Sequence, residues 1–449
     1  MAFFVQEVIS DKSIIPIAAS EKIFPDGNVF SLVVGQNATG KSRLLRKIVS
    51  HFIFANQGSK RDRYIHSNPT ARWNDYSLLS PREEVAVGLY SELKPSKVIA
   101  VSTGRHDRFP SPLKRDSRDT IAEYSYIAPS ENGNISALTQ SLIAITSGLE
   151  VHPWKFESLS GIFEYLGFEP VLDFKISLDP KLKQFFSSSK YVDQTGIERD
   201  QQRGRSAKST AETELLTREF HSLLEYIENQ KSFNYEIHLK YGAEHGHFSL
   251  SHIANALRSG VIRVTDLTLN IRNNKSRLKL SQASSGQQCM LVMILGIAGS
   301  IEDNALICID EPEISLHPKW QSDIIGQLQQ AFNEYKGCHF IIATHSPQIV
   351  AGLTSGNGFV LSLEDQQLYS SEEYSNRSAD FQLAQIFNAP GANNEYLIRI
   401  SLLLLTKISR REPLDSQDRK QIEMLSELKE NLSGSDPVRY LIDQIQMLR

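Results

Sequence analysis

Four short apolar runs along the chain have the length and composition of buried β-strands. They cover residues 29–34, 98–102, 305–310 and 338–344, and valine, isoleucine, leucine and phenylalanine dominate them. Strands that are buried on both faces of a parallel sheet are continuously apolar rather than alternating. The first run is followed by SRLLRKIVSHFI, whose apolar residues recur at helical spacing. This pattern predicts an α/β fold.

Amphipathic helical patterns occupy the middle of the chain. Residues 156–168 and 212–230 have apolar side chains at helical spacing, which predicts a helical insert, or lid, over residues 151–255. Residues 187–210 between them are polar and partly basic, which is typical of a mobile linker, although the arginines could contact a nucleic-acid backbone. Residues 261–280 are predicted to form a hairpin that leads into the next helix.

These patterns divide the chain into four parts. Residues 1–150 and 256–400 would build the two parts of one head, and the insert at 151–255 interrupts them. Residues 401–449 are predicted to form a helical tail. The tail could pack on the head or dock on another protein.

The composition is that of an ordinary soluble protein rather than a basic nucleic-acid binder. Lys and Arg number 48 against 52 Asp and Glu, which gives a formal net charge of -4. Cys289, Cys308 and Cys338 lie in apolar stretches without metal or disulfide spacing, which indicates buried thiols in a reducing compartment. The apolar runs are shorter than the roughly 20 residues of a membrane span, and the N-terminus lacks a basic leader. We therefore expect a cytoplasmic protein with no membrane association.

Residues 35–42, GQNATGKS, lie between the first strand and the first helix. They match G-x-x-x-x-G-K-[ST], and the strand–loop–helix setting is the one this motif requires. Its glycines let the backbone curl so that N–H groups point at phosphate oxygens, and the helix N-terminus adds partial positive charge. Lys41 would reach the β- and γ-phosphates, and the Ser42 hydroxyl would ligate Mg²⁺. The nucleotide-binding residues predicted in this segment are Gly35, Asn37, Gly40, Lys41, Ser42 and Arg43.

Two of the later strands end in residues suited to hydrolysis. Asp310 ends one strand and can hold Mg²⁺ through water, and the next residue, Glu311, can polarise the attacking water as a general base. His345, at the carboxyl end of the last predicted strand, can donate a hydrogen bond to the γ-phosphate. Sites in such sheets open at the carboxyl ends of the strands. Glu311 and His345 are therefore the predicted catalytic residues, and Ser42 and Asp310 the predicted metal ligands.

Residues 279–300 predict a second helix end that suits an anion. Ser284 or Ser285 can cap the helix, its first turn is open, and the remainder is apolar nearly all round. The first loop already has its own helix end, so this one would act on a nucleotide held by another copy of the chain. The residues predicted to contact that nucleotide are Ser285, Gly286 and Gln287.

In this order the four segments resemble the ATPase head of the ABC superfamily: Walker A at 35–42, a signature at 284–288, Walker B at 305–310 and a switch histidine at His345. The segment DEPEISLHP resembles the OLD-like and RecF/SMC-like ATPases, whereas transporters usually show DEPT-x-x-LD. This group includes DNA-repair ATPases and ATPase subunits of bacterial antiphage systems of the OLD, Gabija, PARIS, Septu and retron-associated types. Residues 378–397 are most similar to the Septu-type and retron-associated members.

Two features depart from the pattern of this group. Ala38 stands in Walker A where SMC-like members often carry glycine, and the signature lacks its usual leading leucine. The candidate for the Q-loop glutamine is Gln140.

The resemblance implies a P-loop ABC-type ATPase head with a mixed sheet, a helical insert and a helical C-terminal tail, which uses ATP and Mg²⁺. Two copies would meet head to tail, in a homodimer or a larger homo-oligomer, so that Ser285 of one copy contacts the γ-phosphate held by Lys41 of the other. The chain shows no nuclease signature. The resemblance therefore implies control of a separate nuclease effector, of the HNH or TOPRIM type, in an antiphage complex.

The main alternative is a DNA-repair or chromosome-handling ATPase that binds DNA directly, which predicts DNA-stimulated ATPase activity with a steep salt dependence. Direct contact with DNA or RNA would come from the basic loops at 103–119 and 187–210, which could equally be solvated. A transporter head is disfavoured by the long insert and by His317, where transporters have aspartate. A P-loop kinase would not need residues 284–288, and an idle scaffold would require slow hydrolysis despite a full set of catalytic ligands.

Overall fold

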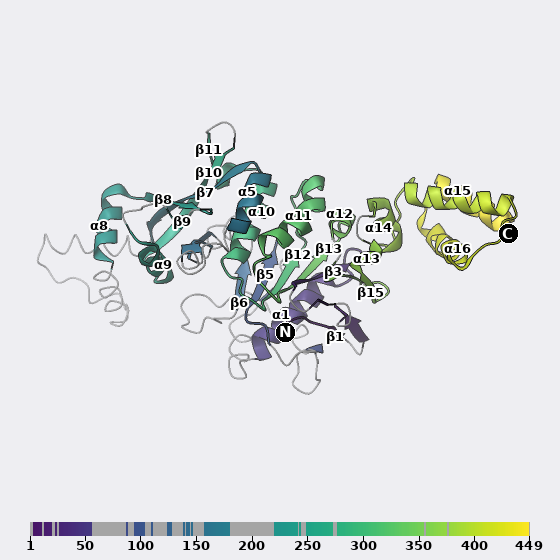
Figure 1. Ribbon diagram of the computed structural model, residues 1–449, viewed down its shortest axis with the longest axis horizontal. Coiled ribbons are helices and arrows are strands. Elements are labelled where there is room, and N and C mark those ends of the chain that lie inside the picture. The colour runs from purple at the N-terminus through teal and green to yellow at the C-terminus, as the bar shows by residue number, and fades with distance from the viewer. Residues whose placement is uncertain are drawn as a thin grey trace, which may run out of the picture. The chain divides into compact units, whose positions relative to one another are not determined.

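The chain forms two compact units. Figure 1 shows the helices and strands that build them. The first combines Met1–Tyr126, Glu302–Gln327 and Tyr335–Arg449, and the second combines Ile127–Ile301 and Leu328–Glu334. The computed structural model describes residues 3–10, 13–19, 23–24, 27–55, 87–88, 94–103, 109–110, 124–127, 138–139, 141–143, 145–146, 157–179, 220–240, 242–243, 248–272, 276–353, 356–374 and 377–448.

A seven-stranded sheet forms the centre of the first unit. In spatial order its strands are β15 (Gln367–Ser370), β14 (Gly358–Ser362), β3 (Val29–Val34), β13 (His339–Thr344), β12 (Leu306–Asp310), β5 (Val98–Ser102) and β6 (Tyr124–Ile127). The five strands from β14 to β5 run parallel, and β15 pairs antiparallel with β14. The predicted α/β fold with a mixed sheet is confirmed.

The four strands that the sequence predicts are neighbours in the middle of this sheet. Every residue of β3, β13, β12 and β5 is buried, which explains why these runs are apolar without alternation. Helix α1 (Lys41–Ala55) follows β3, and its Leu44, Leu45 and Ile48 share a hydrophobic cluster with Val33 of β3 and Ile341 of β13. The loop between β3 and α1 therefore begins and ends on elements that the core holds in place.

His339 is a fully buried polar residue in β13. The Val5 backbone N–H donates to its Nδ1 at 3.0 Å, so Nδ1 is an acceptor and Nε2 carries the proton. Nε2 then donates to Ser31 Oγ at 2.9 Å, and that hydroxyl donates to the Ile17 carbonyl at 2.8 Å. This chain requires a neutral ring, and burial lowers the pKa of His339 to about 3.

Mild acid is expected to destabilise the protein through His339. The folded-state pKa lies below the unfolded value of 6.5, so the unfolded chain binds the proton first and stability falls as the pH drops below 6.5. The expected loss is about 1.4 kcal/mol per pH unit until the pH approaches the folded-state value. Urea unfolding of the wild type and of His339→Asn at pH 7.5, 6 and 5 measures it. Equal pH slopes in the two proteins would contradict the prediction.

The second unit contains a five-stranded antiparallel sheet. Its strands in order are β11 (Arg277–Lys279), β10 (Ile262–Ile271), β7 (Phe168–Leu178), β8 (Phe233–His238) and β9 (Gly242–Ala243). Its longer helices are α5 (Glu157–Tyr165), α8 (His221–Gln230), α9 (Leu250–Arg258) and α10 (Ser285–Ala298). The predicted hairpin before α10 corresponds to β10 and β11, which pair antiparallel.

The predicted helical insert is only part of what residues 151–255 form. The two amphipathic helices are present as α5 and α8, but β7 and β8 also lie within residues 151–255. The buried apolar positions alternate along both strands, as Leu172, Phe174 and Ile176 in β7 and Phe233, Tyr235 and Ile237 in β8. Strand β7 is stabilised by pairing with β8 and β10, which are distant in the sequence, so the local pattern alone did not reveal it.

The C-terminal tail is helical, as predicted. Helices α15 (Glu395–Ser409), α16 (Ser416–Leu428) and α17 (Pro437–Leu448) enclose a hydrophobic cluster of their own, to which Leu404, Leu425 and Ile442 contribute. Four other helices precede them in the part of the chain described after β12: α11 (Pro318–Ala331) after β12, α12 (Pro347–Ala351) after β13, α13 (Ser371–Tyr374) and α14 (Ala379–Gln385).

The remaining described strands, β1 (Glu7–Ser10), β2 (Ser13–Pro16) and β4 (Val87–Gly88), form a small antiparallel sheet. Cys289, Cys308 and Cys338 are buried thiols, as the sequence predicts, and burial raises the pKa of Cys289 to about 12. Within the described ranges, no helix has both the length and the apolar character of a transmembrane segment.

Candidate nucleotide site

The loop between β3 and α1 depends on backbone angles that favour glycine. Gly35 and Gly40 have φ values of 153° and 104°, and a Cβ atom on Gly35 would lie 2.8 Å from Thr39 Oγ1. Ala38 also lies in the left-handed region, with φ of 68°, which costs a non-glycine residue about 1–2 kcal/mol. The alanine that departs from the SMC-like pattern therefore adopts the backbone conformation that glycine adopts more easily.

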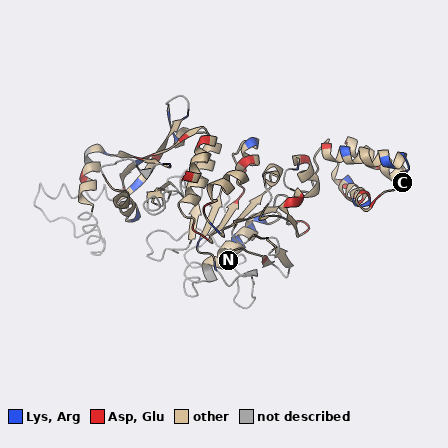
Figure 2. Cartoon of the chain, in the orientation of Figure 1, with Lys and Arg blue, Asp and Glu red and all other residues tan. Residues whose placement is uncertain are grey.

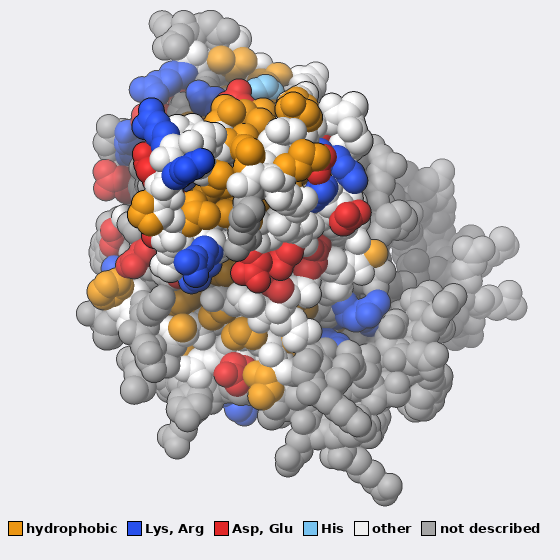
Figure 3. All heavy atoms as spheres, turned by 90° about the vertical axis from the view of Figure 1, so that its right-hand side faces the viewer, with side chains coloured by type: hydrophobic (Ala, Val, Ile, Leu, Met, Phe, Trp, Pro, Cys, Tyr) orange, Lys and Arg blue, Asp and Glu red, His pale blue; other side chains and the backbone are white. Residues whose placement is uncertain are grey.

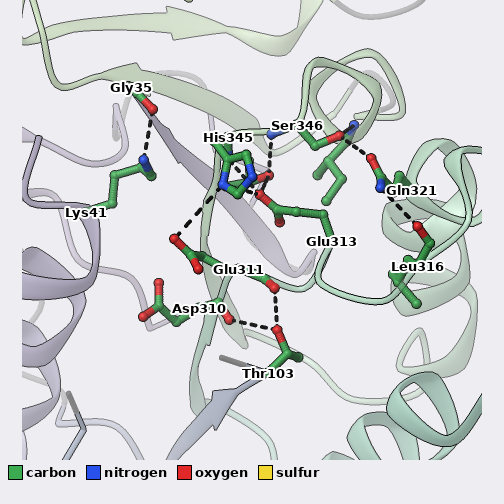
Figure 4. Close-up of polar contacts among 12 residues, drawn as sticks. Gly35, Lys41, Thr103, Asp310, Glu311, Glu313, Leu316, Gln321, His345 and Ser346 are labelled. Carbon is green, nitrogen blue, oxygen red and sulfur yellow. Dashed lines mark hydrogen bonds and ion pairs between the residues drawn. The ribbon is translucent and has the colours of Figure 1, made fainter. Parts of the chain in front are cut away.

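Lys41 is held inside this loop (Figure 4). Its side chain is buried, and Nζ donates to the carbonyl oxygens of Gly35 at 2.8 Å and Gln36 at 3.0 Å. Burial lowers the pKa of Lys41, while carboxylates, led by Glu311 and Glu313, raise it in part. The ammonium group thus has carbonyl partners that phosphate oxygens could replace without new desolvation of the lysine.

The two predicted metal ligands are adjacent. Ser42, at the start of α1, donates from Oγ to Asp310 Oδ1 at the end of β12, and the distance is 3.0 Å. A hydroxyl and a carboxylate are hard oxygen ligands of the kind that Mg²⁺ prefers. The donor set therefore fits Mg²⁺. Its hydroxyl belongs to the residue directly after Lys41.

Glu311 has a strained backbone that its neighbours hold in place. Its φ of 51° is left-handed, and such positions cluster at functional sites. The Glu311 N–H donates to the Ala343 carbonyl at 2.9 Å, and the Thr103 hydroxyl donates to the Glu311 carbonyl oxygen. Its Oε1 lies 4.0 Å from His345 Nδ1, so the two predicted catalytic side chains approach each other (Figure 4).

His345 follows β13 and its side chain is 43% exposed. Its closest carboxylate belongs to Glu313, whose Oε1 lies 3.1 Å from Nδ1. The sequence analysis did not assign Glu313 or Thr103 to the site. Glu313 is the second glutamate of DEPE, so the motif contains it, but only the fold shows that its carboxylate turns inward.

The signature-like helix end belongs to the second unit. Ser284 is the N-cap of α10 and forms a capping box with Gln287, in which each side chain accepts from the other residue's backbone N–H. Of the two candidate caps, the structure therefore selects Ser284, and Ser285 is the first residue of the helix. Ser285 is exposed, Gly286 is buried, and the Gln287 side chain is engaged in the capping box.

Other predicted residues have less defined surroundings. Asn37, within the phosphate loop, and Arg43, directly after it, are exposed. Gln140 and residues 187–210 lie outside the described residues, as do the basic residues of 103–119. Across the described elements, Lys and Arg are interspersed with Asp and Glu (Figure 2).

Part of the chain matches a known family model. Residues 157–351 match the family described as "AAA domain, putative AbiEii toxin, Type IV TA system". Among solved structures, Stu0660 of Streptococcus thermophilus aligns over 100% of this chain and 93% of its own with a TM-score of 0.36 and 11% identity. The Smc head domain of Pyrococcus furiosus aligns over 82% and 96% with a TM-score of 0.31 and 12% identity.

Three curated proteins are similar over a limited stretch. Retron Ec83 probable ATPase of Escherichia coli is 32% identical over 106 residues, which cover 21% of this chain and 19% of that protein. Retron Vc95 probable ATPase of Vibrio cholerae is 26% identical over 106 residues, covering 21% and 20%, and Septu protein PtuA of Bacillus mycoides is 27% identical over 103 residues, covering 21% and 14%. The chain thus aligns with a fifth or less of the length of each relative. Its residues 157–351, which include Asp310, Glu311 and His345, match an AAA domain, and the chain is similar to retron ATPases and to Septu protein PtuA.

Proposed function

We propose that this chain is an ATP-binding and ATP-hydrolysing regulatory subunit of a cytoplasmic antiphage defence complex. The observation that supports this most is the convergence of the phosphate loop, the Ser42–Asp310 pair at 3.0 Å and the Glu311–His345 pair at one edge of a single sheet. Similarity to retron ATPases and to Septu protein PtuA supports the defence role.

The residues of the site suit the steps of ATP hydrolysis. The loop N–H groups and Lys41 bind the phosphates, with Lys41 exchanging two carbonyl partners for phosphate oxygens. Ser42 and Asp310 would hold Mg²⁺, which supplies charge neutralisation at the phosphates. Glu311 accepts a proton from the attacking water, and His345 donates to the γ-phosphate.

The charge of the site also favours the magnesium complex over free ATP. Four carboxylates, those of Glu311, Glu313, Asp310 and Glu364, act on the single ammonium group of Lys41. Additional phosphate charge would be repelled by this acidic surrounding. We therefore expect ATP to bind as its magnesium complex, because the cation offsets charge that Lys41 alone does not.

We propose that two copies close head to tail on ATP. Ser284 caps α10, so the exposed Ser285 hydroxyl and the first free N–H groups of this helix remain available to an anion. A γ-phosphate held by Lys41 of one copy would take these donors from the other copy. Its removal by hydrolysis would weaken the closed pair, so ATP and ADP would favour two different geometries.

A separate nuclease, of the HNH or TOPRIM type, is the proposed reader of these geometries. The C-terminal helices offer a surface for such a protein, because large apolar side chains are exposed on α15 and α17: Leu402, Leu403, Tyr440, Met447 and Leu448. Figure 3 looks onto the end of the chain that carries these helices, where apolar side chains gather among Lys and Arg side chains. Exposed apolar clusters of this kind are typical of protein interfaces.

Ser285→Arg is expected to prevent closure without preventing nucleotide binding. The large cation would block the first turn of α10 in the closed pair, while the Lys41 loop of the same chain is unchanged. We expect Mg·ATP affinity within about twofold of wild type, no ATP-dependent dimer in light scattering, and ATPase activity reduced by at least about tenfold, a change of about 1.4 kcal/mol in the barrier. Gln282→Arg, an exposed position three residues earlier, is the matched control.

Unchanged dimerisation and ATPase activity in Ser285→Arg would rule out the contact between copies. Purified wild-type protein distinguishes the two candidate functions. The defence role predicts that the native protein co-purifies with a second protein. A DNA-repair role predicts instead that duplex DNA stimulates ATPase activity, with the stimulation falling steeply as salt rises.

A further inference from the structure

Glu313 is a buried carboxylate on the turn that follows β12. Its side chain is only 4% exposed, although it lies three residues after Asp310 at the edge of the nucleotide site. Taking a carboxylate out of water is costly unless hydrogen bonds replace its hydration. The partners of each of its two oxygens therefore indicate why the residue is there.

The two oxygens of Glu313 have very different surroundings. Oε1 accepts from Thr344 Oγ1 at 2.9 Å and from the His345 backbone N–H at 2.7 Å, and it lies 3.1 Å from His345 Nδ1. Oε2 is buried and has no hydrogen-bond partner among the described residues. If the carboxylate served only to stabilise the fold, both oxygens would be expected to accept hydrogen bonds. This one concentrates the polar contacts of the side chain on the residues at and just before the switch histidine.

The contact at 3.1 Å also sets the orientation of the histidine ring. The Nδ1 edge of the ring lies against Glu313 Oε1, which holds that edge toward the turn after β12. Nε2 is then the ring nitrogen that remains for the nucleotide. A carboxylate beside one nitrogen of an imidazole restrains the orientation of the ring.

The other side of the same loop is tied to the same turn. Ser346 Oγ donates to Gln321 Oε1 at 2.7 Å, and Gln321 Nε2 donates to the Leu316 carbonyl at 3.1 Å. Leu316 in turn donates from its backbone N–H to the Glu313 carbonyl at 3.0 Å. The contacts form a closed ring that joins the end of β13 to the turn after β12 (Figure 4). Within this ring, Glu313 is the member that contacts the imidazole.

We propose that Glu313 is a positioning residue that holds the His345 ring at the distance and angle required for the γ-phosphate. This inference rests on the proposed ATPase function and adds a residue to it. Glu311 remains the group that acts on water, at 4.0 Å from the same ring nitrogen. Glu313 is one of several charges near Lys41, but His345 is the predicted catalytic side chain that it contacts, and its other oxygen faces no described donor.

Two substitutions separate position from charge. Glu313→Gln keeps the reach of an accepting oxygen and removes the charge, whereas Glu313→Asp keeps the charge and withdraws the oxygen by one methylene. We expect Glu313→Gln to retain kcat for ATP within about fivefold, the cost of one weakened hydrogen bond. We expect Glu313→Asp to lower kcat by roughly 10- to 100-fold with KM for ATP within about twofold, because a misplacement of about 1 Å can cost that much in rate.

A double-mutant cycle with His345→Ala tests whether the effect passes through the histidine. The double variant Glu313→Asp/His345→Ala is expected to have the kcat of His345→Ala alone, since no imidazole remains to be placed. Multiplying effects in the cycle would overturn the proposal, as would an active Glu313→Asp beside an inactive Glu313→Gln. A residue with only a structural role would give the multiplying result.

The control for loss of a buried carboxylate is Asp173→Asn in β7, which is also buried and also has one oxygen without a described partner. Its kcat is expected to equal that of wild type. A wild-type chain that does not hydrolyse ATP would overturn the proposed function and this inference with it. A wild type that hydrolyses ATP, combined with multiplying effects in the cycle, would overturn this inference alone.

Discussion

Replacing Glu311 by glutamine is expected to lower kcat for ATP hydrolysis by about 10²–10⁴-fold, the usual contribution of a general base. Glutamine has the same shape but cannot accept the proton of the attacking water. The backbone contacts with Ala343 and Thr103 that hold this left-handed residue do not involve the side chain and are retained. Mg·ATP affinity is therefore expected to stay within about twofold of wild type, as measured by titration calorimetry.

The same variant is expected to accumulate as the closed pair, because ATP binds and is not removed. Light scattering with ATP present would show a dimer that persists for much longer than that of wild type. Glu302→Gln, an exposed glutamate beside Lys97 at 3.6 Å, is the matched control and is expected to behave as wild type. Wild-type turnover in Glu311→Gln would show that another group activates the water.

Lys41→Ala is expected to weaken ATP binding by at least about 10²-fold. The two hydrogen bonds that Nζ makes to Gly35 and Gln36 would, with nucleotide bound, be replaced by charge-assisted bonds to phosphate, each worth about 1.5–3 kcal/mol. The variant also leaves the acidic side chains around the loop without a counter-charge, which opposes the approach of phosphate. Calorimetric titration with Mg·ATP measures the loss.

Lys47→Ala, on the same helix, is the control for removal of a positive charge. It is expected to bind Mg·ATP as wild type does. Retained affinity in a folded Lys41→Ala protein would show that residues 35–42 are not a nucleotide-binding loop.

The central strands and the phosphate loop could be predicted because their signals are local. A continuous apolar run such as residues 29–34 identifies a buried strand, and the glycines that follow it identify the turn, whatever the rest of the chain does. The carboxyl ends of β12 and β13 then place Asp310 and His345 together, because the two strands pair in parallel. For these elements, the local pattern and the tertiary structure agree.

The antiparallel sheet of the second unit and the role of Glu313 could not be predicted in the same way. Strand β7 is stabilised by β8 and β10, which are separated from it by long stretches of sequence, and short windows favoured the flanking helices. Glu313 is visible as a letter of DEPE, but its function depends on the carboxylate turning toward β13 rather than toward solvent. Whether Ser284 or Ser285 caps α10 likewise depends on the backbone angles, and either serine could have been the cap from the sequence alone.

The pairing of β3 with β13 has a consequence for folding during translation. Val29–Val34 finds both of its sheet neighbours, β13 and β14, about 300 residues further along the chain. At about 5–20 residues per second, translation takes tens of seconds to supply them. During that interval the apolar strand lacks both of its sheet neighbours. We therefore expect the nascent N-terminal region to bind chaperones. Any nucleotide-dependent activity is thereby postponed until most of the polypeptide has been made.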